Sequence, residues 1–344
     1  TIYLKHLANA LSNTGYLIDQ KGDALKALEY HLKSLKIREE LKDKQGIAVS
    51  FSNIGTIYYR QGDVPKALDY FHRGLIINEA IKNNVSTAIA LNNLGIMYYN
   101  QHDYAKALEY YTRSLKLQEQ MKNDDGIAMA LNNIGGVYDM DKNYPKAIEY
   151  MQRSLKIREK LKNKKTMAVS MVNIGNVYNK INEITIAQDY LFKGLTIQEE
   201  IDDKLGMAIT LNIVANSFIR SNNLNEAENY AKRCHELSSS LGYPQNIKNS
   251  ASTLKEIYYK KAKYEEAFEM LKLEIKMRDS INNEQTRKAS IKTQLKYEFE
   301  KKEAVIKEQQ EKERAMAEEK SRFQKIVIAS VLFGLLLVIV FAVF

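Results

Sequence analysis

The chain has 344 residues, of which 45% are hydrophobic and 27% charged, a composition typical of folded proteins that excludes general disorder. Only 3 prolines occur, which favours helices because proline breaks them. The net charge is +9, but the basic residues are interspersed with glutamates, so we interpret the charge as a solvated helical surface rather than a nucleic-acid site. The single cysteine, Cys234, excludes an intrachain disulfide and is expected to be a small buried residue.

A pattern recurs every 40 residues up to about residue 279. In the third unit, Leu91, Leu94 and Tyr98 share one face of a first helix, and Ala107 and Tyr111 share one face of a second. The glycine of this pattern recurs at Gly15, Gly55, Gly95, Gly135 and Gly175, and its alanine at Ala27, Ala67, Ala107, Ala147, Ala187, Ala227 and Ala267. Each unit is therefore predicted to be two helices joined by a turn, and neighbouring units must stack to bury their apolar faces.

The run from Leu91 to Gly95, together with Tyr98, Ala107 and Tyr111, resembles the tetratricopeptide repeat. The usual repeat has about 34 residues, so this chain is similar to the longer variety found in kinesin light chains and in scaffold proteins of cell polarity. The resemblance implies an all-α superhelical solenoid of about seven helix-turn-helix repeats. Its concave groove would bind a segment of another protein or peptide.

We assign the predicted solenoid to residues 1–280. Its seventh unit departs from the pattern, with Lys255 in place of the glycine and Met270 in place of a tyrosine. Such a departure is expected of a terminal repeat that caps the array.

An asparagine recurs two residues before each glycine, about 200° around the helix from the packing face, and is expected to point away from the core. The column consists of Asn13, Asn53, Asn93, Asn133 and Asn173. In tetratricopeptide arrays the first helices line the concave surface, so the resemblance implies a ladder of amides that contacts a bound peptide through donors and acceptors alike. The alternative is a structural role, such as a bond to the backbone of the next repeat. Neighbouring positions vary and would tune specificity; the candidates are Arg60, Asn100, Asn176 and Lys180.

Two further segments follow the repeats. Residues 281–325 are rich in Lys, Glu and Gln without Gly or Pro, which predicts a long charged connector helix, either exposed or a weak coiled coil that pairs two copies into a homodimer. Residues 326–344 are apolar and uncharged, and would span about 28 Å as a helix. We therefore expect a single-pass transmembrane helix, in a bacterial inner membrane with the side undecided, and a chain that continues beyond Phe344.

We find no phosphate-binding loop, no dinucleotide-binding glycine motif and no zinc-binding H-E-x-x-H motif. The sequence therefore predicts no catalytic residue, cofactor, metal or nucleic-acid partner. The order of repeats, charged helix and apolar segment resembles bacterial membrane-anchored tetratricopeptide sensors, which implies a sensory or scaffolding module in signal transduction. The alternative is the non-catalytic half of a sensor histidine kinase whose catalytic domain lies beyond Phe344.

Overall fold

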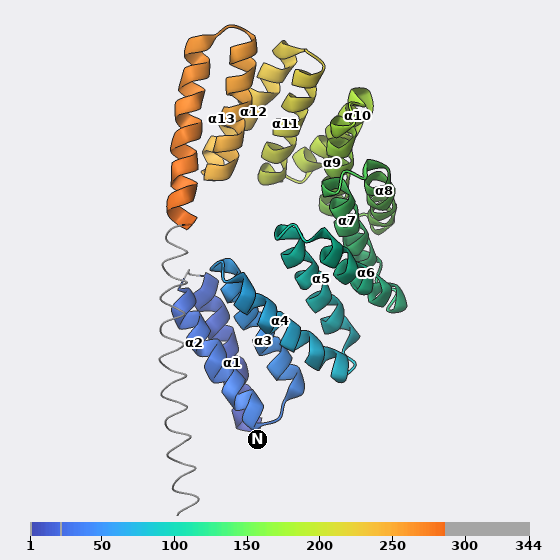
Figure 1. The fold of residues 1–344 in the computed structure, drawn as a ribbon, viewed down its shortest axis with the longest axis vertical. Coiled ribbons are helices and arrows are strands. Elements are labelled where there is room, and N and C mark those ends of the chain that lie inside the picture. The colour runs from blue at the N-terminus through green and yellow to red at the C-terminus, as the bar shows by residue number, and fades with distance from the viewer. Residues whose placement is uncertain (1, 21–22, 286–344) are drawn as a thin grey trace, which may run out of the picture. The chain divides into compact units, whose positions relative to one another are not determined.

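The computed structural model describes residues 2–20 and 23–285. Within these ranges every regular element is a helix. The helices labelled in Figure 1 are α1 (Ile2–Gln20), α2 (Ala24–Glu40), α3 (Lys44–Arg60), α4 (Val64–Ala80), α5 (Asn84–Asn100), α6 (Tyr104–Gln120), α7 (Asp124–Met140), α8 (Tyr144–Leu161), α9 (Lys164–Lys180), α10 (Ile184–Glu200), α11 (Lys204–Arg220), α12 (Leu224–Leu241) and α13 (Pro244–Lys260). A further helix over 264–285 is called the last described helix below.

The helices pack in chain order. Each odd-numbered helix forms a hairpin with the even-numbered helix that follows it, and each hairpin packs on the next (Figure 1). The last described helix completes the seventh hairpin by packing Met270 near Leu254 and Ile257 of α13. The prediction of a helical repeat solenoid is therefore confirmed, with the hairpins at the period read from the sequence.

The turns between helices are built alike. Ten of the twelve helices from α2 to α13 begin after an Asp or Asn whose side chain accepts a hydrogen bond from a backbone N–H three residues on, as Asp103 does from Lys106 at 3.1 Å. One residue earlier the backbone is left-handed, with φ of 55° at Lys122 and 78° at Gly62. Because the left-handed residue recurs after each helix from α2 to α13, the turn inside a hairpin and the link between hairpins have the same geometry.

Inside the first five hairpins, glycine permits close helix contact. A Cβ built on Gly95 would lie 2.5 Å from Cε1 of Tyr111, so only glycine fits at this crossing. Beside it, the rings of Tyr98 and Tyr110 stack with their centres 5.3 Å apart. Equivalent pairs stack in four other repeats, which supports the interpretation of the tyrosines as packing residues.

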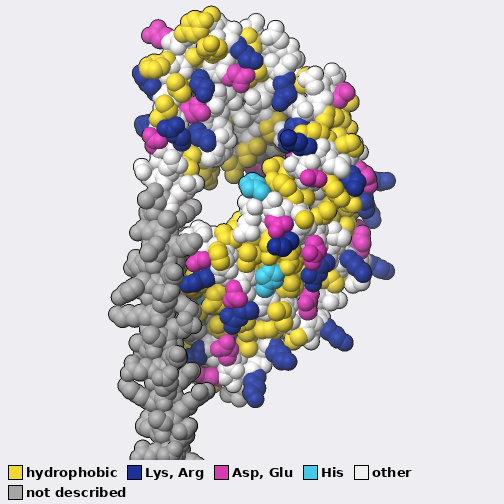
Figure 2. All heavy atoms as spheres, viewed as in Figure 1, with side chains coloured by type: hydrophobic (Ala, Val, Ile, Leu, Met, Phe, Trp, Pro, Cys, Tyr) yellow, Lys and Arg dark blue, Asp and Glu magenta, His cyan; other side chains and the backbone are white. Residues whose placement is uncertain are grey.

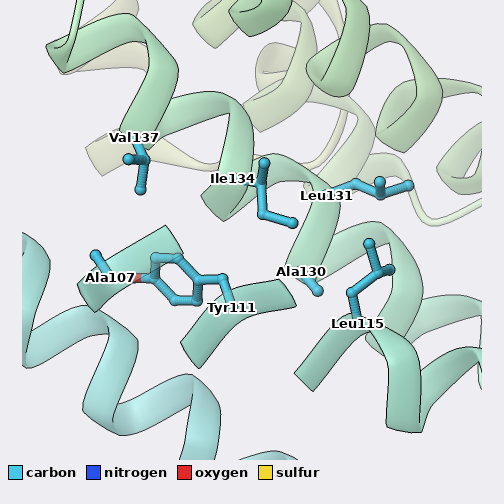
Figure 3. Close-up of a cluster of buried hydrophobic side chains, with 7 residues drawn as sticks. All are labelled: Ala107, Tyr111, Leu115, Ala130, Leu131, Ile134 and Val137. Atoms are coloured by element: carbon cyan, nitrogen blue, oxygen red, sulfur yellow. The ribbon is translucent and has the colours of Figure 1, made fainter. Parts of the chain in front are cut away.

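Between hairpins, side chains of an even-numbered helix pack beneath the next odd-numbered helix. Figure 3 shows Tyr111 and Leu115 of α6 against Leu131 and Ile134 of α7. All four are at most 9% exposed. Cys234 occupies a comparable buried site, as expected, with its Sγ 3.2 Å from the carbonyl oxygen of Ala208.

The expected membrane localisation is corrected. Among residues 2–20 and 23–285, no helix combines the length and the apolar character needed to cross a lipid bilayer. The segment 326–344, on which that expectation depended, lies outside the described residues, as does the connector 281–325 beyond residue 285. The homodimer expected through that connector stays a prediction, as does the domain boundary at residue 280.

Candidate functional site: the face of the odd-numbered helices

The odd-numbered helices approach one another as well as their hairpin partners: α1 contacts α3, α9 contacts α11 and α11 contacts α13. These contacts bend the stack toward the odd-numbered helices, so their exposed faces form its concave side. We call this side the groove face, and we call positions that recur every 40 residues a column, named after its first member. Columns 9, 13, 16 and 20 are spaced i, i+4, i+7 and i+11, and therefore lie on one stripe of each helix.

Column 13 holds the predicted asparagines, and most of them bridge adjacent repeats. Nδ2 of Asn53 donates to Oγ of Ser12 at 3.2 Å. Nδ2 of Asn133 donates to Oδ1 of Asn92 at 2.8 Å, and Asn173 repeats this bond to Asn132 at 3.2 Å. Each partner lies 41 residues earlier, so every bond joins one odd-numbered helix to the preceding one.

Substitutions elsewhere in column 13 preserve the bridge. In the seventh repeat Oγ1 of Thr253 donates to Oδ1 of Asn212 at 2.9 Å. In the sixth, Ile213 packs against the buried cluster of Val172, so an apolar pair replaces the polar one. The column is therefore a structural link between repeats, although not the side-chain-to-backbone bond considered from the sequence. Asn93 is half-buried, and Asn13 in the first repeat is exposed.

Two of the bridging asparagines, Asn133 and Asn173, could also bind a ligand. Oδ1 of Asn133 and of Asn173 accept no hydrogen bond within the described residues. Both side chains are half-buried at the groove face rather than enclosed between helices. Each amide can therefore hold its neighbour with its nitrogen and receive a donor, such as a peptide N–H, with its oxygen.

Column 20 follows the same 41-residue relation. The guanidinium of Arg60 pairs with Asp19, and Nδ2 of Asn100 donates to the hydroxyl of Tyr59. Lys180 Nζ lies 2.7 Å from a carboxylate oxygen of Asp139. All three residues were candidates for ligand specificity, and the structure places them in bridges between repeats.

A pocket of about 230 Å³ opens between α7 and α9 on the groove face. Its lining includes Asn133, Asn173 and Asn176, so it brings together three of the predicted residues, with Tyr99 on a neighbouring helix. Gly136 is part of the lining, and a Cβ built on it would meet nothing within 4 Å. Burial, and secondarily the Asp139 carboxylate, raise the pKa of Tyr99, so its hydroxyl remains a donor at neutral pH.

Sequence reasoning missed column 9. Its members in the second to sixth repeats are apolar side chains with between 37% and 52% of their surface exposed: Val49, Ile89, Met129, Val169 and Ile209. They precede the asparagines by one helical turn and so line the groove face beside them. The signal was available, because the apolar type recurs at the repeat period, but exposure could be assigned only once the packing was known.

Charge changes sign along the groove-forming helices. Helix α7 contains Asp124, Asp125 and Asp139 and no basic residue. Helices α9 and α11 together contain five basic residues and no acidic one. Of these, Arg220 in column 20 makes no ion pair among residues 2–20 and 23–285. On the other surfaces visible in Figure 2, basic and acidic side chains are mixed, in agreement with a solvated surface.

The described residues include no group of three or more His, Cys, Asp or Glu side chains placed to hold a metal ion. The buried histidine His31 is also unsuited to acid–base chemistry at neutral pH, because burial, and then Arg38, lower its pKa to about 4. The groove face therefore offers amides, apolar side chains and a few charges, which are the groups that recognise polypeptide.

Comparison with known proteins agrees with this architecture. A family model described as "Tetratricopeptide repeat" matches residues 6–80, 86–160 and 126–200. No curated protein matches the sequence of this chain.

Among solved structures, the apo form of RapI superposes with a TM-score of 0.68 at 20% identity, over 80% of this chain and 99% of that one. A signal transduction ATPase with numerous domains and a tetratricopeptide repeat sensor, from Pyrococcus horikoshii, gives 0.65 at 20% identity, over 81% of this chain and 44% of that one. A Rap protein in complex with competence and sporulation factor gives 0.60 at 16% identity, over 80% and 75% of the two chains. At these identities the likeness concerns the fold.

Proposed function

Because this chain belongs to the tetratricopeptide repeat family, we propose that it binds a peptide segment of a partner protein along the groove face, as a non-catalytic interaction module. The family supplies the class of function, and the groove face supplies the chemistry. The segment would run across several odd-numbered helices, because the exposed columns continue from repeat to repeat.

The observation that carries the proposal is the exposed apolar column 9 beside the pocket over Gly136. Five exposed apolar side chains recur in register along this face, and such a row favours a partner's apolar side chains. The pocket can take one side chain between the amides of Asn133 and Asn173. Together they would fix a peptide by apolar contact and by amide pairing with its backbone.

The charge pattern predicts the orientation of the bound peptide along the groove face. An acidic stretch of peptide would lie over α9 and α11, where the odd-numbered helices carry only basic residues. The opposite end of the peptide would lie over α7, which carries no basic residue to attract an acidic group. Arg220 is the residue expected to contact the acidic stretch.

We further propose that occupancy of the groove face controls a signalling output. The support is the fold shared with a Rap protein bound to a competence and sporulation factor and with the sensor of a signal transduction ATPase. One of these fold relatives binds a factor, and the other uses its repeats as a sensor.

A peptide selection tests the binding proposal. Random peptides displayed on phage are selected on the wild-type chain, and enriched peptides are synthesised and titrated by fluorescence anisotropy. Replacing Gly136 by Met places a side chain in the pocket from a Cβ position that has no neighbour within 4 Å, and Ile89→Ser removes one apolar contact of column 9. Both should weaken binding at least about tenfold, which corresponds to about 1.4 kcal/mol.

The matched control is Ile76→Ser on α4, an apolar residue with 64% exposure outside the groove columns. It should leave binding unchanged. If selection enriches no peptide, or if enriched peptides bind all variants alike, the groove face is not the binding surface.

A further inference from the structure

In each of the first six repeats, the odd-numbered helix that follows packs over the same set of side chains. Column 31 shows this most clearly, since its first six members are at most 4% exposed: His31, Phe71, Tyr111, Met151, Leu191 and Ala231. In the third repeat the cover is α7, which lays Leu131, Ile134 and Val137 over Tyr111 (Figure 3).

Within residues 2–20 and 23–285, no following helix covers the same columns in the seventh repeat. Leu271 in column 31 is 36% exposed, and Ile275 in column 35 is 38% exposed. Phe268 and Tyr264 on the same helix are 55% and 63% exposed, and Tyr259 at the end of α13 is 67% exposed. The last repeat therefore lacks the polar outer face expected of a cap.

These side chains line a hollow rather than a flat patch. A pocket of about 510 Å³ lies between α13 and the last described helix, with Tyr259, Tyr264, Phe268 and Leu271 in its walls. Charges at its edge are balanced: Lys255 pairs with Glu274 at 2.7 Å, and Lys272 pairs with Glu269 at 2.7 Å. The surface thus selects for shape and apolar contact more than for charge. We call it the end surface.

We propose that the end surface binds an α-helix of a partner protein, which takes the place that an eighth first helix would take. The internal interfaces define the ligand. At the equivalent surface of the third repeat the covering helix presents one small and three larger apolar residues, Ala130, Leu131, Ile134 and Val137, spaced i, i+1, i+4 and i+7. This spacing places all four on one helical stripe. The partner helix carries the same pattern, and its contact is separate from peptide binding over α5 to α11.

The chain itself provides the probe. A fluorescent peptide with the sequence of residues 124–140, acetylated and amidated at its ends, is titrated into the 344-residue protein and followed by anisotropy. Saturable binding is expected, because the peptide reproduces the helix that covers the equivalent side chains internally. A peptide with Leu131→Asp and Ile134→Asp should show no saturable binding.

Protein variants locate the contact. The double substitution Phe268→Glu and Leu271→Glu should weaken binding at least about tenfold, while circular dichroism stays unchanged because both side chains are exposed. Ile76→Glu, on an exposed part of α4, is the matched control and should bind as wild type.

The pocket variant Gly136→Met should also leave this binding unchanged, so that failure of the groove proposal and failure of the end-surface proposal can be told apart. If the wild-type chain shows no saturable binding, as it would with an end surface already covered within the chain, the proposal is overturned. Undiminished binding by the double variant overturns it as well, because the contact then lies elsewhere.

Discussion

Substituting alanine for either of the adjacent glycines Gly135 and Gly136 adds one methyl group and tests the packing of the array. Both lie inside α7, where alanine is better suited to a helix than glycine by about 1 kcal/mol. At Gly136 an added Cβ meets nothing within 4 Å. Gly136→Ala should therefore stabilise the fold by up to about 1 kcal/mol.

At Gly135 the same methyl would lie 2.7 Å from Cγ of Met151 and 3.2 Å from the backbone oxygen of Ala147. Relieving this overlap requires α7 and α8 to separate, at a cost of about 1–3 kcal/mol. After the helix-propensity gain, Gly135→Ala should be neutral to destabilising by about 2 kcal/mol. The difference between the two variants isolates the overpacking cost, since propensity contributes equally to both.

The assay is thermal unfolding followed by far-ultraviolet circular dichroism. A shift of about 1.5 °C per kcal/mol is expected for a chain of this size, so the two midpoints should differ by about 1.5–5 °C. Equal midpoints, or a lower midpoint for Gly136→Ala, would refute the assignment of Gly135 to the packing face and Gly136 to the groove face.

Three other predictions concern caps, pH and bridges. Asp103→Ala should destabilise by about 1 kcal/mol, because it removes the cap of α6, whereas Glu183→Ala should have little effect because Glu183 makes no cap bond; urea unfolding of both variants checks this. The lowered pKa of buried His31 predicts that its contribution to the free energy of unfolding is fully present above pH 6.5. About 2 kcal/mol, after allowance for solvent screening, should be lost as the pH falls from 6.5 toward 4. His31→Phe should abolish the part of this loss that melting curves show between pH 7 and 5.5. A double-mutant cycle replacing Asn133 and Asn92 by Ala should give a coupling of about 0.5–1.5 kcal/mol, and a value near zero would show that their hydrogen bond contributes nothing to stability.

The helical part of the fold could be predicted because its cause is local. The spacing of Leu91, Leu94 and Tyr98 specifies one apolar stripe, and the identical spacing 40 residues on specifies that hairpins stack. The close helix contact at Gly95 has a local signal too, because a residue without a side chain on an apolar helical face indicates that a second helix lies close to it.

The bridges between repeats could not be predicted in the same way. A bond between Asn133 and Asn92 depends on the rotation of one hairpin relative to the next, and the period of the sequence does not contain that angle. The sequence predicts asparagines that point away from the core, but their contact with a neighbouring repeat follows from the curvature that brings odd-numbered helices together. The same curvature decides which apolar residues, such as Ile89, are left exposed.

Because the turns are alike, whole hairpins could be removed from the chain or added to it. Since α5 and α7 begin after the same kind of asparagine-capped turn, an in-frame loss of residues 84–123 would join Asn83 directly to Asp124, with an asparagine still in front of the helix. The loss would also bring Asn133 opposite Ser52, an amide facing a hydroxyl as in the pair of Asn53 and Ser12. A single recombination event could therefore remove or add one hairpin, because the existing turn sequences would still join the helices.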